Sequence, residues 1–138
     1  MRVVFGLIAD SAEISEHGKL NIMGVFSSIR ASAFPAVHPK MCLVIRFEVL
    51  SVEFGVEKDL RIALVGPSGK EAVAVEGKFK VNLDDPSATI PLMVEHDQII
   101  QWNDVTFPEA GGYAFHVLVQ GDPKGSVPLT LLKMDAPS

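Results

Sequence analysis

The chain has 138 residues, of which 48% are hydrophobic and 21% charged, so it can bury a core and is too apolar to stay disordered. Twelve basic and 17 acidic residues give a net charge of −5 with no long run of Lys or Arg, which argues against a nucleic-acid partner. The mean hydropathy of +0.29 is high for so few charges and favours a homo-oligomer that hides apolar surface. The single cysteine, Cys42, cannot form an internal disulfide, which suits a reducing cytoplasm.

The first apolar run, Val3 to Ala9, is predicted to be a strand. It is too short for the apolar region of a signal peptide and has no convincing cleavage site after it. No apolar segment of the chain approaches the roughly 20 residues needed to cross a bilayer, so we expect no membrane partner. Both faces of this strand are apolar, one with Val3, Phe5, Leu7 and Ala9, the other with Val4, Gly6 and Ile8. Such a strand is typically buried on two sides or meets a partner at an edge.

Alternating apolar residues continue through most of the chain. Leu20 to Ile29 is predicted to pair with the first strand, and Phe34 to Lys40, which holds two prolines, to cross between sheets. Glu95 to Asp97 is expected to begin a polar connection. Further strands are predicted at Met41 to Val52, Leu60 to Val65, Val73 to Val81, Ala88 to Val94, Ile99 to Phe107, Gly112 to Gln120 and Lys124 to Lys133. About nine short strands at this spacing predict a two-sheet antiparallel sandwich, all-β and without a disulfide, as one domain over residues 1–138.

The stretch around Tyr113 favours an immunoglobulin-like version of this sandwich. Glu109, Gly111, Tyr113 and Phe115 resemble the acid-x-Gly-x-Tyr-x-Cys pattern at the E to F corner of immunoglobulin domains. The resemblance implies that the Tyr113 hydroxyl bonds back to upstream backbone and pins the crossing between the sheets. Phe115 stands where that family has a cysteine, so an apolar ring is expected to fill the central position.

The chain as a whole is similar to an uncharacterised family of short bacterial proteins. The similarity rests on Leu7 to Asp10, Gly18 to Phe26, Phe34 to Ala36 and Phe107 to Val117. It implies a bacterial cytosolic origin, and it brings no known activity or ligand.

No set of residues has the spacing of a catalytic or metal site. His38, His96 and His116, with Asp97, are not spaced as ligands on a strand or helix, so solvent-facing histidines are expected. The serines lack the glycines of a nucleophile elbow, and Cys42 has only Lys40 nearby to lower the pKa of its thiol. We therefore expect no enzyme activity, no metal and no cofactor.

Trp102 is the candidate recognition residue, because an aromatic ring beside Gln101, Asn103 and Asp104 could stack on a sugar or anchor a partner. The other interpretation is that Trp102 caps the open end of the sandwich. The leading hypothesis is a non-enzymatic binding or assembly module that presents a strand edge or loop end to a protein partner or to a second copy. The alternative is a small-ligand or carbohydrate-binding domain that uses loops around Trp102 and His96.

Overall fold

The computed structural model describes residues 1–82 and 91–135, which form an all-β fold of two sheets. The strands of the described residues are β1 (Arg2–Ile14), β2 (Leu20–Phe26), β3 (Ser28–Ala31), β4 (Ala36–Leu50), β5 (Lys58–Val65), β6 (Glu71–Phe79), β7 (Met93–Phe107), β8 (Gly111–Val119) and β9 (Asp122–Lys133). One turn of 3-10 helix, η1 (Ser51–Glu53), is the sole helical element of that part of the chain. No helix there is long and apolar enough to span a bilayer.

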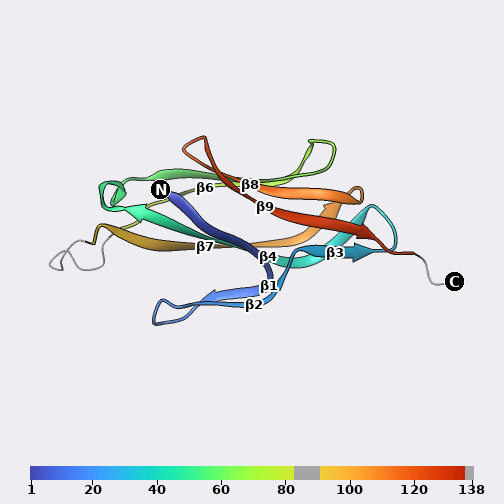
Figure 1. The fold of residues 1–138 in the computed structure, drawn as a ribbon, viewed down its shortest axis with the longest axis horizontal. Helices are drawn as coiled ribbons and strands as arrows, with labels where there is room; N and C mark the ends of the chain where they lie inside the picture. The colour runs from blue at the N-terminus through green and yellow to red at the C-terminus, as the bar shows by residue number, and fades with distance from the viewer. Residues whose placement is uncertain (83–90, 136–138) are drawn as a thin grey trace.

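The two sheets lie one above the other (Figure 1). The first has the strand order β2-β1-β4-β7 and the second the order β3-β9-β8-β5-β6. Neighbouring strands are antiparallel except β3 and β9, which run parallel. The predicted two-sheet, mostly antiparallel sandwich without a disulfide is thus confirmed, with Cys42 free and buried.

The core lies between the inner faces of the sheets, where alternate residues of each strand point inward. On β4 these are Met41, Leu43, Ile45, Phe47 and Val49, each at most 1% exposed. They belong to one apolar cluster with the inward residues of the second sheet, which include Leu60, Ile62, Leu64, Phe115 and Val117. Apolar burial on this scale is the main force that holds the two layers together.

The strand order is compatible with an immunoglobulin-like topology. Strands β1-β4-β7 follow the A-B-E order of that sandwich, and β9-β8-β5-β6 follow G-F-C-C′. The second half of β1 and β2 form an added hairpin on the side of the first sheet that faces away from the second (Figure 1). Val44, which alternates with core residues and so faces this outer side, is nevertheless fully buried.

Two predicted strands and the predicted crossover loop differ from the observed elements. The predicted strand Leu20 to Ile29 divides at Ser27 into β2 in the first sheet and β3 in the second. The expected crossover loop is shorter, because Ala36 to Lys40 belongs to β4 and pairs with β7. Pro39 sits in that stretch between the paired residues His38 and Lys40.

The third difference is the length of β7, which includes Glu95 to Asp97 instead of leaving them in a polar connection. Arg46, opposite Asp97 on β4, binds its carboxylate through two nitrogens at 2.8 and 3.0 Å, and this pairing satisfies the charge within a strand. The predicted strand Ala88 to Val94 lies partly outside the described residues.

A bulge in β1 changes which of its residues share a face. Val3 lies opposite Phe47, whereas Phe5 lies opposite Arg46. Val3 therefore packs on the core, whereas Phe5 faces outward. The Arg46 guanidinium carbon lies 5.4 Å from the centroid of the Phe5 ring. The prediction that Val3 and Phe5 share a face is wrong, because the extra residue of a bulge reverses the alternation.

Candidate functional site

Tyr113 fixes the point where the chain passes from β7 in the first sheet to β8 in the second. Its side chain is nearly buried, and its hydroxyl donates a 2.7 Å hydrogen bond to the carbonyl oxygen of Glu109. The Glu109 N–H donates back to the same hydroxyl at 3.3 Å. The ring meets Phe107 edge-on, with centroids 5.1 Å apart. This is the bond that a tyrosine corner requires, and it involves the backbone of Glu109 instead of its carboxylate.

The other two corner residues also have structural roles. Gly111 has φ +130°, and a Cβ there would lie 2.8 Å from Cγ of Pro67, so a larger residue would be strained and crowded. Phe115 is fully buried, and its ring centroid lies 5.4 Å from that of Trp102. The corner thus has a structural role at the turn between the sheets.

The small-ligand hypothesis requires loops around Trp102, but this residue lies within β7. Its side chain is 6% exposed and points into the core, so the ring cannot stack on a sugar. Its indole Nε1 is buried without a hydrogen-bond partner among the described residues. The recognition role expected for Trp102 is therefore corrected: its inward position on the strand makes it a core residue.

His96 is half-buried on the inner side of β7, opposite Phe47. Its ring is stacked on Phe79 of β6, with centroids 5.2 Å apart and planes parallel within 1°. Its Nε2 lies 2.7 Å from the amide nitrogen of Gln98, a contact that needs a neutral ring accepting the amide proton. Burial lowers the pKa of His96 and favours this neutral form, although the charge of Asp97 opposes the shift.

Trp102 and His96 do not form one site. They are six positions apart on a strand that rises ~3.3 Å per residue, so they lie roughly 20 Å apart. The structure also separates the metal candidates, and no group of three or more His, Cys, Asp or Glu side chains in residues 1–82 and 91–135 could hold an ion.

The first sheet ends in a different surface, the outer edge of β2. Within the described residues no strand pairs with this edge. Met23 is 70% exposed and Val25 57%, so the strand carries apolar side chains to solvent beside its free backbone groups. Gly24 between them has φ +73° and lies against Asp10.

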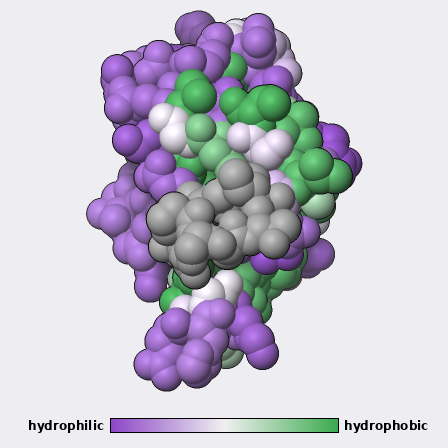
Figure 2. All heavy atoms as spheres, turned by 90° about the vertical axis from the view of Figure 1, so that its left-hand side faces the viewer, coloured by the Kyte–Doolittle hydropathy of each residue, from purple (hydrophilic) through white to green (hydrophobic). Residues whose placement is uncertain are grey.

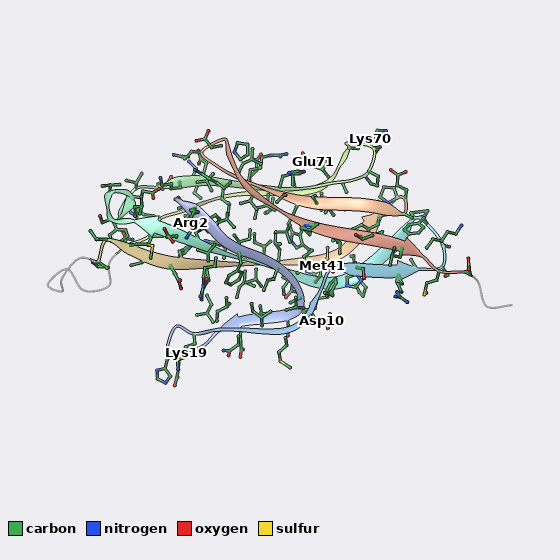
Figure 3. All side chains as sticks on the ribbon, viewed as in Figure 1. Arg2, Asp10, Lys19, Met41, Lys70 and Glu71 are labelled. Atoms are coloured by element: carbon green, nitrogen blue, oxygen red, sulfur yellow. The ribbon has the colours of Figure 1, made fainter. Side chains whose placement is uncertain are left out.

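A hollow of about 410 Å³ adjoins this edge where β2 leads into β3. Its walls include Val25 and Phe26 together with Asp10 of β1, Arg30 of β3 and His38 of β4. Asp10 marks the bend where the hairpin leaves the sandwich (Figure 3). The hollow therefore places an acid, a guanidinium and an imidazole next to the edge of β2. Sequence reasoning missed this group because its members come from three strands in two different sheets, which the strand pattern alone does not place side by side.

Exposed apolar side chains also gather where β4 ends and β7 begins (Figure 2). They include Leu50, Val52, Leu92 and Met93. This group belongs to η1 and to the ends of β4 and β7, and β7, although it is the outer strand of its sheet, carries the charged residues Glu95 and Asp97. The β2 edge with its adjoining hollow is therefore the better candidate for an interaction surface.

A family model covers residues 4–132 of the chain, nearly the whole of both sheets. Its description is "Family of unknown function (DUF6941)". The chain belongs to this family. Membership of DUF6941 agrees with the similarity to an uncharacterised family seen in the sequence and assigns no activity. No curated protein matches the chain.

Proposed function

We propose that the protein is a non-enzymatic assembly module that pairs the free edge of β2 with the same edge of a second copy. Antiparallel pairing of two β2 strands about a two-fold axis would join the first sheets of both copies into one. The high apolar content of the chain supports such self-association. The free, buried thiol of Cys42 supports a reducing, cytoplasmic location.

The observation that carries the proposal is the lack of protection on β2. Edge strands are normally guarded by charges, by proline or by being very short. β7 carries Glu95 and Asp97, β6 carries Glu71, Glu76 and Lys78, and β3 has only four residues. The seven residues of β2, Leu-Asn-Ile-Met-Gly-Val-Phe, include no charge and no proline.

The exposed side chains of β2 would gain from pairing. Met23 and Val25 would lose contact with water on association. Their burial would stabilise the dimer by about 25 cal/mol per Å² of apolar surface. Asp10 and Arg30, beside the strand, carry opposite charges that could fix the register of a second copy.

Light scattering after size-exclusion chromatography tests the proposal. The wild type should elute as a dimer, and Val25→Lys should shift it to a monomer. Val52→Lys, at a valine that is 82% exposed on η1, is the matched control and should leave the dimer intact. A wild type that remains monomeric up to millimolar concentration would contradict self-assembly, as would a dimer that Val25→Lys does not weaken.

A further inference from the structure

The sandwich has an open side where β6 and β7, the last strands of their sheets, face each other. The inward positions of β6 are Val73, Val75, Gly77 and Phe79, since these lie opposite or in phase with the core residues of β5. Those of β7 are His96, Gln98, Ile100 and Trp102, opposite the core residues of β4. The two rows of side chains therefore meet along this side.

A hollow of about 170 Å³ interrupts the contact between the rows, and we call it the β6–β7 slot. Its inward walls are Leu60, Val75, Gly77, Phe79, Gln98 and Ile100. The volume is close to the ~150 Å³ of an engineered enclosed cavity that binds benzene, whereas this slot is open to solvent beside the exposed Val75 and Gly77. The slot thus has room for one six-membered ring.

Gly77 is the cause of the hollow. It stands where the apolar row of β6 would otherwise continue, and a Cβ built on it meets no atom within 4 Å. Its φ is not in the left-handed region, so the backbone there does not require glycine. A glycine inside a strand costs stability relative to a residue with a side chain, and here it leaves a pocket open.

The slot has one polar wall. The Gln98 amide nitrogen contacts Nε2 of His96 at 2.7 Å, and the His96 ring is in turn stacked on Phe79. These contacts orient the carboxamide, and with its nitrogen directed to His96 the carboxamide oxygen is the acceptor that Gln98 offers to a ligand. Glu76 and Lys78 flank the slot with opposite charges, so it has no preference for an ion. A neutral molecule avoids the cost of burying a charge.

We propose that the β6–β7 slot binds a small neutral molecule with one aromatic ring and one hydroxyl group, of the phenol class. The ring contacts Ile100, Val75 and Leu60 in the space that Gly77 leaves. The hydroxyl donates a hydrogen bond to the carboxamide oxygen of Gln98. Apolar walls with a single well-placed polar group are the usual composition of a small-molecule site.

Phenol itself is the probe, titrated into ¹⁵N-labelled protein and followed by the amide signals of Gly77 and Ile100 and the side-chain amide of Gln98. We expect saturable shifts with a dissociation constant on the order of a millimolar, as suits so small a ligand. Absence of saturable shifts at these three groups up to several times that concentration would overturn the proposal.

Two variants separate the slot from general apolar binding. Gly77→Val fills the space and should weaken phenol binding at least tenfold. Gly112→Val, at a β8 glycine where a Cβ also meets nothing within 4 Å, is the matched control and should bind phenol as the wild type does. Equal phenol binding by Gly77→Val and the wild type would overturn the proposal.

Gln98→Met, which keeps the length of the side chain and removes the acceptor, tests the hydroxyl contact. It should lower the affinity for phenol to that for benzene and leave benzene binding unchanged. A variant that still prefers phenol as the wild type does would contradict the assignment. Because the slot lies on strands other than β2, its failure would not affect the proposed assembly.

Discussion

The hydroxyl of Tyr113 and the carbonyl oxygen of Glu109 are joined by a 2.7 Å hydrogen bond across the turn between β7 and β8. The bond spans only four residues of sequence, yet it lies where the chain changes sheets. The two layers are therefore held in register at this turn by a polar contact beside a mostly apolar core.

Tyr113→Phe removes this bond and keeps the ring against Phe107. We expect a loss of about 1 kcal/mol in the free energy of unfolding, because a partly buried hydrogen bond disappears without a replacement from the protein. Urea denaturation followed by circular dichroism measures this loss. An unchanged midpoint would mean that the corner bond does not contribute to stability.

The carboxylate of Glu53 should make stability depend on pH. Burial alone would raise the pKa of Glu53, but hydrogen bonds from Lys58, the N-terminal ammonium and the Leu50 backbone outweigh it and lower the pKa from 4.5 to about 2. The contacts of the two cations with the carboxylate measure 2.8 and 2.7 Å. The folded state therefore binds the Glu53 proton less readily than the unfolded state.

Because the folded pKa is the lower one, the contribution of Glu53 is complete above pH 4.5 and is lost as the pH falls toward 2. Its size is on the order of 3 kcal/mol, because each tenfold loss of proton affinity on folding corresponds to about 1.4 kcal/mol. Urea midpoints of the wild type and Glu53→Gln, measured from pH 7 to pH 2, test this. The two curves should converge in acid, and a constant difference between them would rule out the lowered pKa.

Gly24 should resist substitution even by alanine. It has φ +73°, and a Cβ there would collide with the side chain of Asp10. We expect Gly24→Ala to lower the free energy of unfolding by about 1 to 2 kcal/mol, because an L-residue is strained in this region. Gly112→Ala, at an open position without positive φ, is the control and should be nearly neutral. Equal urea midpoints for the two variants would contradict the role given to Gly24.

Strand alternation and the residues around Tyr113 were enough to predict the architecture. The alternation of Ile45, Phe47 and Val49 identifies a strand with one buried face, and the buried positions of β4 follow it. The boundaries were less predictable where pairing overrides local pattern. Asp97 reads as part of a loop in sequence, but it lies within the β4–β7 pairing and its charge is met by the opposing Arg46.

The candidate site was predicted only in part. The apolar pattern of Leu20 to Ile29 predicted a strand paired with the first one, but the position of β2 at the end of a sheet depends on β1 pairing with β4 on its other side. For Trp102, the sequence suggested a surface role, but the residue lies in the core. Its polar neighbours Gln101 and Asn103 are exposed on alternate positions of the strand, while the indole between them points inward. A one-residue alternation thus separates a surface ring from a core ring.

The parallel pairing of β3 with β9 has a consequence for synthesis on the ribosome. Ser28 lies beside Thr130, roughly 100 positions later in the chain, and contacts of such long range slow folding. During synthesis, β3 cannot pair with β9 until β9 has left the exit tunnel. A nascent chain stalled before β9 would therefore leave strand edges open on both β3 and β8, and such intermediates are prone to aggregate.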